Sequence, residues 1–179
     1  MNAPLPSHLL HTQDALADTD PQETAEWRDA FLALVATEGP ERARHMLQEL
    51  VRVARSHGMR LLGPNCLGTV NVVDKLVGSF SIALEQNMPP AGHVGIVSQS
   101  GNIGSFTMSN MAQRGLGVSR FIATGNEADV DVAECIDYLA EDPDTRVICA
   151  ALESCRDGTR LRTALLKAAA AGKPVLIMK

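Results

Sequence analysis

Short apolar runs alternate with segments of helical periodicity along residues 93–179. Each run has the length of a strand, and the third run is almost wholly apolar, as in strands covered on both faces. The segments between the runs place apolar side chains three and four residues apart, which predicts helices. This alternation predicts an α/β fold with a parallel sheet and right-handed crossovers. The four predicted strands are Val94–Val97, Val118–Ala123, Arg146–Leu152 and Pro174–Met178.

Small polar residues, acidic residues and glycines mark the ends of the predicted helices. The first helix follows Ser100, the second begins at Asp129–Asp131 and ends at Asp142–Asp144, and the third begins at Asp157 and ends at Gly172. Ser and Asp side chains cap helix N-termini, and glycine is favoured just after a helix C-terminus. The helix ends therefore agree with the positions of the predicted strands.

A different pattern precedes Gly58. Residues 1–19 hold prolines and show no apolar period, and we expect a disordered tail there. Asp20-Pro21-Gln22-Glu23 is typical of a helix start, with an acidic N-cap and proline at the first helical position. Gly39-Pro40 then separates this helix from a second one. We therefore expect an αα-hairpin over residues 20–58, whose apolar faces must bury against each other, the following domain or a partner.

Residues 59–92 carry weaker signals. Met59–Leu62 is predicted to be a strand that ends in the turn Gly63–Gly68. Cys66 in this turn is either a buried small apolar side chain or a thiol of a site, and the local sequence, without a histidine or a cation, favours burial. Residues 69–92 hold Asn, Gly and Ser and end in a proline- and glycine-rich run, which predicts a linker.

The composition excludes several classes of function. Hydrophobic residues make up 45% of the 179 residues, enough for a sizeable core. The net charge is −5 without a basic patch, which argues against nucleic acid as a partner. Four cysteines without a Cys-x-x-Cys pair indicate reduced thiols in the cytoplasm, and no metal site is predicted. The N-terminus is not typical of a signal peptide, and no apolar run reaches the roughly 20 residues of a membrane span.

The candidate anion site is the junction between the first strand of this region and its helix. Ser98, Gln99, Ser100 and Gly101 follow Val94–Val97, and Asn102 comes next in the helix. A strand that enters a helix through small polar residues leaves N–H groups unpaired at the helix start, where the helix dipole also favours an anion. The pattern indicates either a cradle for phosphate or carboxylate, or an ordinary β–α turn capped by Ser100.

Two further polar segments are predicted at the same edge of the sheet. Gly125, Asn126 and Glu127 follow the second strand, and Glu153 follows the third. The carboxyl ends of parallel strands share one edge, and ligands of such sheets bind there. We therefore expect these residues to lie near Ser98–Gly101.

Four motifs resemble those of the NDP-forming acyl-CoA synthetases, which are relatives of the succinyl-CoA synthetase α subunit. The motifs keep the order and spacing of that family over about residues 59–179. The resemblance implies a remnant of a CoA-binding domain and a linker over residues 59–92. It implies an incomplete flavodoxin-like domain, a parallel sheet with flanking helices, over residues 93–179. The motifs are Gly63–Gly68, Val97–Gly101, Gly125–Asp129, and Tyr138-Leu139 with Asp142–Thr145.

This family converts acyl-CoA, phosphate and NDP to acid, CoA and NTP through an acyl phosphate and a phosphohistidine. The resemblance implies a turn near the CoA thioester, a phosphate-binding loop, and an acid that contacts the phosphorylated histidine. The implied CoA-binding turn is Gly63, Pro64, Asn65 and Cys66. The implied phosphate-binding residues are Ser98, Gln99, Ser100, Gly101 and Asn102. The implied catalytic acid is Glu153.

Two parts of such an enzyme find no match in this sequence. The phosphorylated histidine follows the fourth strand in the family, and none of His8, His11, His45, His57 and His93 matches it. The ATP-grasp part, which takes ADP or ATP with Mg²⁺, is not matched either. We therefore expect the chain to be inactive alone, to work with an ATP-grasp subunit or domain, and to be capable of forming a homo-oligomer.

Residues 18–52 resemble the N-terminal segment of the homodimeric bacterial pyruvate dehydrogenase component. In that family the segment docks onto the acyltransferase core of the multienzyme complex. The resemblance implies a docking or dimerisation module, and the other interpretation is a solvated helical hairpin. The alternative function for the chain is therefore a non-catalytic interaction module that docks through its helical hairpin.

Overall fold

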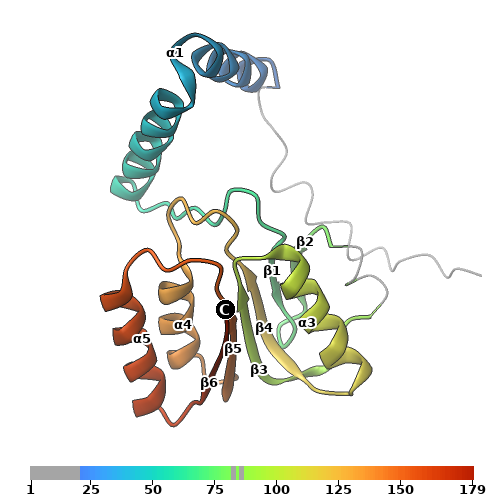
Figure 1. The fold of residues 1–179 in the computed structure, drawn as a ribbon. Coiled ribbons are helices and arrows are strands. Elements are labelled where there is room, and N and C mark those ends of the chain that lie inside the picture. The colour runs from blue at the N-terminus through green and yellow to red at the C-terminus, as the bar shows by residue number, and fades with distance from the viewer. Residues whose placement is uncertain (1–20, 82–83, 85–86) are drawn as a thin grey trace, which may run out of the picture. The chain divides into compact units, whose positions relative to one another are not determined.

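The computed structural model describes residues 21–81, 84 and 87–179 (Figure 1). The predicted tail, residues 1–19, and the predicted N-cap Asp20 lie outside the described residues. The chain divides into two compact units, Met1–Leu50 and Val51–Lys179, and their boundary falls within the first helix, α1. The sheet and the candidate site belong to the second unit.

Helix α1 contains both of the helices predicted near the N-terminus. It spans Pro21–Ser56 and is interrupted at Gly39, where φ is 84° and ψ is 170°. Glycine adopts a positive φ without a steric penalty, and the proline that follows is tolerated in the first turn of a new helix. The predicted break at Gly39-Pro40 is therefore confirmed.

Six strands form one sheet, in the order β2–β1–β4–β3–β5–β6. The strands β4, β3, β5 and β6 are parallel neighbours, whereas β1 pairs antiparallel with both β2 and β4. The predicted parallel sheet of an α/β fold is confirmed, with all four predicted strands of residues 93–179 in place. The strands are β1 (Gly68–Asn71), β2 (Leu76–Ser79), β3 (Ala91–Ser98), β4 (Val118–Ala123), β5 (Val147–Ala151) and β6 (Val175–Met178).

The strand predicted at Met59–Leu62 is wrong. This segment lies outside the sheet, although the Leu61 carbonyl accepts a hydrogen bond from the Val130 N–H at 3.1 Å. The Leu61 N–H donates to the Asp129 carboxylate at 2.7 Å. Because a side chain takes the place of a main-chain acceptor here, the regular ladder of a strand pair does not form.

The strands β1 and β2 form where the sequence predicts only a linker. They pair over Gly68–Asn71 and Leu76–Ser79, and β1 also pairs with β4, with Val70 opposite Phe121. The turn between them lacks the Asn-Gly or Asp-Gly pair that signals a tight hairpin. The sheet therefore extends beyond the predicted parallel strands by an antiparallel pair.

Helices cover both faces of the sheet (Figure 1). Helix α3 (Gly101–Gln113) packs on one face against β3 and β4. Helices α4 (Val132–Glu141) and α5 (Gly158–Ala170) pack together on the other face. None of the described helices combines the length and the apolar character that crossing a membrane requires.

A separate apolar cluster fills the space under each helical layer. Successive side chains of a strand point to opposite faces, so Ile96 lies in the cluster under α3 and Val97 in the cluster under α4 and α5. Helix α3 approaches the sheet closely at Gly104, where an added Cβ would lie 2.7 Å from Cε2 of Phe121 in β4 and 3.2 Å from Cβ of Ser98. The first turn of α3 therefore lies against β4 and the end of β3.

Candidate functional site

The structure brings all the predicted site segments to the carboxyl edge of the parallel strands. Ser98 ends β3, residues 125–127 follow β4, and Glu153 follows β5. The turn 63–66 reaches the same edge from outside the sheet. There the Asn126 N–H donates to the Pro64 carbonyl at 2.9 Å, and the Ala128 N–H donates to the Gly63 carbonyl at 2.7 Å.

Gly125 is the point of closest approach between the 63–66 turn and the loop after β4. Its φ is +58°, and a Cβ there would lie 2.5 Å from the carbonyl oxygens of both Pro64 and Asn65. On the other side of the turn, a Cβ at Gly101 would lie 3.0 Å from Cγ of Leu67. The segment 64–67 therefore lies between the 125–127 loop, which it approaches at Gly125, and the start of α3, which Leu67 approaches at Gly101.

The loop after β4 is held by groups of the loop after β5. Arg156 donates through Nη1 to the Glu127 carbonyl and through Nη2 to the Asn126 carbonyl, the latter at 2.9 Å. The Glu127 side chain is buried, and its Oε1 accepts from the Val132 N–H at 2.9 Å. Asn126 and Glu127 therefore shape the edge, and the Glu127 carboxylate is engaged at the start of α4.

Cys66 packs against the apolar cluster under α3 and is half-buried. Its Sγ lies 3.7 Å from the Leu62 carbonyl oxygen, within reach of a weak S–H hydrogen bond. Of the two interpretations of this residue, these contacts support the packing role.

The N-terminus of α3 carries no acidic side chain in its first turn. Ser100 is the N-cap, and its Oγ accepts from the Ile103 N–H over a long 3.4 Å. Ser98 is buried, and its hydroxyl donates to the Ser100 carbonyl at 2.7 Å. The N–H groups of Gly101 and Asn102 have no acceptor within the helix, because the first turn of a helix lacks preceding carbonyls. Gly101 is half-buried and Asn102 is exposed.

Helices α4 and α5 begin differently, because carboxylates accept their first N–H groups. Asp131 Oδ1 accepts from the Glu134 N–H at 2.8 Å, in addition to the bond between Glu127 and Val132. Asp157 Oδ1 accepts from the N–H groups of Thr159 and Arg160 at 2.9 and 3.0 Å. Of the three helices that flank the sheet in the described part of the chain, only α3 therefore offers its N-terminal dipole to an external anion.

Gln99 joins the loop after β3 to the loop after β5. Its Oε1 accepts from the N–H groups of Glu153 and Ser154 at 2.6 and 2.8 Å, and its Nε2 donates to the Ser154 carbonyl at 3.1 Å. The Gln99 N–H donates to the Ala151 carbonyl at 3.1 Å. Gln99 therefore holds the two loops together, which places the exposed Glu153 relative to α3.

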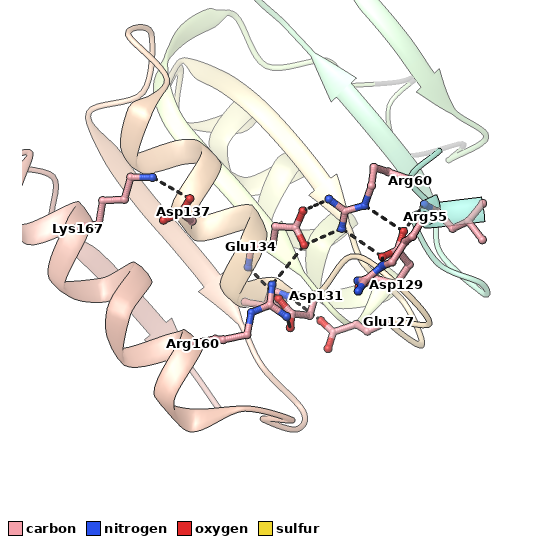
Figure 2. Close-up of polar contacts among 11 residues, drawn as sticks. Arg55, Arg60, Glu127, Asp129, Asp131, Glu134, Asp137, Arg160 and Lys167 are labelled. Carbon is pink, nitrogen blue, oxygen red and sulfur yellow. Dashed lines mark hydrogen bonds and ion pairs between the residues drawn. The ribbon is translucent and has the colours of Figure 1, made fainter. Parts of the chain in front are cut away.

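An ion-pair cluster lies beside the 63–66 turn (Figure 2). The side chain of Asp129 is 0% exposed and accepts hydrogen bonds from Arg55 Nε, from Arg60 Nη2 at 3.2 Å and from the Leu61 N–H at 2.7 Å. The Arg55 Nη2 also donates to the Asp129 carbonyl at 3.0 Å. The sequence placed Asp129 at the start of a helix and in the Gly125–Asp129 motif, and neither local pattern indicates its pairing with Arg55 and Arg60.

Glu134 extends this cluster towards α5. It accepts from Arg60 Nη2 at 2.8 Å, and Arg160 Nη2 lies 3.4 Å from its Oε2. Arg160 also pairs with Asp131 at 2.9 Å, as Figure 2 shows. Despite these acidic groups, no group of three or more His, Cys, Asp or Glu side chains within the described ranges is placed to hold a metal ion.

Opposing effects act on the pKa of Asp129. Burial raises it, but the hydrogen bonds from Arg60, the Leu61 N–H and Arg55 outweigh burial and hold the pKa at about 2, below the ordinary 3.8. The pKa of Glu134 is lowered chiefly by its hydrogen bond with Arg60. Both carboxylates are therefore ionised over the physiological range.

The lowered pKa of Asp129 predicts a loss of stability in acid. A depressed folded-state pKa stabilises the protein above the unfolded pKa, and that stabilisation disappears as the pH falls through the folded pKa. Between about pH 4 and about pH 2, we expect the free energy of unfolding to fall by about 2 kcal/mol more in the wild type than in Asp129→Asn. Urea unfolding at several pH values measures both slopes, and equal slopes would contradict the assigned pKa.

Two protein families match different parts of this chain. Residues 91–179 match the family described as the succinyl-CoA ligase like flavodoxin domain. Residues 20–62 match the N-terminal domain of the pyruvate dehydrogenase E1 component. Both resemblances inferred from the sequence motifs are thereby confirmed.

Individual relatives agree with the first match. A trans-feruloyl-CoA synthase from an unknown prokaryotic organism is 40% identical over 73% of this chain. The α subunit of ADP-forming acetate–CoA ligase II from Pyrococcus furiosus is 33% identical over 78% of this chain. The chain spans only 18% and 29% of the length of these two relatives.

A solved structure shares the fold. It is a dinucleotide-forming acetyl-coenzyme A synthetase from Candidatus Korarchaeum cryptofilum in complex with phosphate and ADP. It superimposes with a TM-score of 0.64 at 32% sequence identity, over 75% of this chain and 28% of the solved chain.

Proposed function

We propose that this chain, whose residues 91–179 match the succinyl-CoA ligase like flavodoxin domain, is part of an NDP-forming acid–CoA ligase. In the proposed reaction, acyl-CoA, phosphate and NDP give acid, CoA and NTP. The chain holds the phosphate, and then the acyl phosphate, at the N-terminus of α3. ADP-forming CoA ligases among the relatives support this reaction class.

The observation that carries the proposal is the difference between the three helix N-termini at the carboxyl edge. Carboxylates of Glu127, Asp131 and Asp157 accept the first N–H groups of α4 and α5, whereas α3 begins with the neutral Ser100. An anion at this edge is repelled from α4 and α5 and attracted to α3. Preorganised N–H donors of this kind also stabilise charge that develops during phosphoryl transfer.

The neighbouring segments have assigned parts in this proposal. The Gly63–Cys66 turn lies near the CoA thioester, and Glu153 contacts a phosphorylated histidine. That histidine and the ATP-grasp part that takes ADP or ATP with Mg²⁺ come from other segments or subunits. The α subunits among the relatives support a partner chain. On this basis we expect the chain alone to show no CoA- and NDP-dependent uptake of phosphate.

The phosphate site predicts a local response to inorganic phosphate. In a two-dimensional NMR titration of the full chain, we expect the amide signals of Gly101 and Asn102 to shift in a saturable way. The amide signals of Val132 and Thr159 serve as internal references, because carboxylates already occupy the N-termini of α4 and α5. Unchanged signals at Gly101 and Asn102 at millimolar phosphate would contradict the site.

A variant with a negative charge at the N-cap of α3 tests the phosphate site. Ser100→Asp keeps a good helix cap but places a carboxylate where α4 and α5 carry theirs, so phosphate affinity is expected to fall by about tenfold or more. Asn110→Asp adds the same charge near the far end of α3 and is expected to retain binding. Equal loss in both variants would show that net charge, rather than the α3 N-terminus, governs the response.

A second candidate function is docking through the N-terminal unit. Residues 20–62 match a pyruvate dehydrogenase N-terminal domain, and Trp27 is 66% exposed. A large aromatic side chain in that position is typical of protein-binding surfaces. This function requires no phosphate binding at α3, so the titration above separates the two candidates.

A further inference from the structure

The main chain on either side of Asp129 forms a row of hydrogen bonds with the segment 61–64. The Val130 N–H donates to the Leu61 carbonyl at 3.1 Å, and the Ala128 N–H donates to the Gly63 carbonyl at 2.7 Å. The row continues with the bond from the Asn126 N–H to the Pro64 carbonyl. The position of the 63–66 turn therefore depends on the loop that carries Asp129.

The Asp129 carboxylate closes this row at its outer end. It accepts the Leu61 N–H at 2.7 Å, and it binds two guanidinium groups that precede the turn in the sequence, Arg55 and Arg60. Both arginine side chains are about half exposed, whereas the carboxylate between them is completely buried. The buried carboxylate is thus the shared partner that fixes the chain entering the turn.

We propose that Asp129 is a positioning residue that holds the Gly63–Cys66 turn against the 125–128 loop and thereby sets the affinity of this edge for CoA. The CoA part of this inference rests on the proposed function. Asp129 itself does not touch the ligand; it acts through the main chain of residues 61–64. Removal of its charge leaves two guanidinium groups without their buried partner, and loss of the side chain also leaves the Leu61 N–H unpaired.

Amide hydrogen exchange in the full chain tests the positioning directly. In Asp129→Asn, we expect the exchange rates of the Asn126, Ala128 and Val130 amides to rise about tenfold or more, because their acceptors are released. The amides of β5, which pair within the sheet, are expected to keep their rates. Arg60→Gln removes one partner and leaves the carboxylate, so it is expected to give a smaller increase at the same amides.

The control is a partly exposed ion pair away from the edge. Asp137→Asn removes one of the two carboxylates that Lys167 contacts on the helical layer, where its Nζ lies 2.7 Å from each. It is expected to leave the exchange of the three loop amides unchanged. Equal rates for these amides in the wild type, Arg60→Gln and Asp129→Asn would overturn the positioning role. A uniform rise over the whole sheet would overturn it too, since that result indicates only a general loss of stability.

Calorimetric titration with CoA tests the functional consequence. We expect Asp129→Asn to bind CoA about tenfold more weakly than the wild type, and Asp137→Asn to bind it equally well. Equal affinity in wild type and Asp129→Asn would overturn the inference. If the wild type itself does not bind CoA, the CoA assignment and the functional half of the inference both fall. The exchange experiment still decides whether Asp129 positions the turn.

Discussion

Replacing Gly125 with alanine is expected to lower the free energy of unfolding by about 3 kcal/mol or more and to separate the Gly63–Cys66 turn from the edge of the sheet. The added Cβ would lie 2.5 Å from the carbonyl oxygens of Pro64 and Asn65, and main-chain atoms cannot move aside as a flexible side chain can. The positive φ of +58° adds about 1–2 kcal/mol for a residue with a Cβ, and overpacking adds about 1–3 kcal/mol.

Gly115 offers the matched control for this substitution. It has a similar φ of +66°, but nothing lies within 4 Å of a Cβ built there. Gly115→Ala therefore measures the conformational cost alone, about 1–2 kcal/mol. Urea unfolding followed by circular dichroism compares the two variants. Equal losses would mean that the 63–66 turn does not press on Gly125 in solution.

Replacing Arg120 with methionine is expected to cost about 3–5 kcal/mol of unfolding free energy, because it leaves a buried carboxylate without its cation. The Arg120 side chain is 10% exposed, and its partner Asp142 is 3% exposed. Its Nη2 lies 3.3 Å from Asp142 and 2.9 Å from Asp144, and its Nη1 donates to Asn71 at 2.7 Å. One side chain of β4 thus joins the end of β1 to the loop before β5.

Two further variants separate the burial of charge from the loss of contacts. Arg160→Met removes an arginine whose side chain is 47% exposed, and it is expected to cost only about 0–1 kcal/mol. The double variant Arg120→Met/Asp142→Asn replaces the unpaired carboxylate with a neutral amide. We expect it to recover part of the unfolding free energy that Arg120→Met loses. Failure of this rescue, with similar losses for Arg120→Met and Arg160→Met, would show that Arg120 acts as an ordinary surface ion pair.

The elements with local signals were predictable from the sequence. Strand β4 occupies the predicted Val118–Ala123, because an apolar run lies between glycine-containing turns. Helices α4 and α5 begin directly after Asp131 and Asp157, whose side chains accept N–H groups only a few residues ahead. In each case the interactions that define the element lie within a few residues of it.

The features that the sequence did not reveal depend on distant partners. Strand β1 is stabilised by pairing with β4, with Thr69 opposite Ile122. Gln99 binds the main chain of residues 153–154, and Asp129 pairs with Arg55, which lies 74 residues earlier in the sequence. Local patterns contain no information about such pairings, since a carboxamide or a carboxylate suits a ligand and a protein partner equally well.

Asp129 pairs with Arg55 and Arg60, which both lie within the segment that matches pyruvate dehydrogenase. The end of that match at residue 62 therefore differs from the boundary between the two compact units, which follows Leu50. Similarity to the pyruvate dehydrogenase segment extends through residue 62, yet both arginines within it bind the other part of the chain. An engineer who recombined genes at residue 62 would therefore sever an intact folding unit. Exchange of the helical segment is expected to be better tolerated after Leu50, the last residue of the first compact unit.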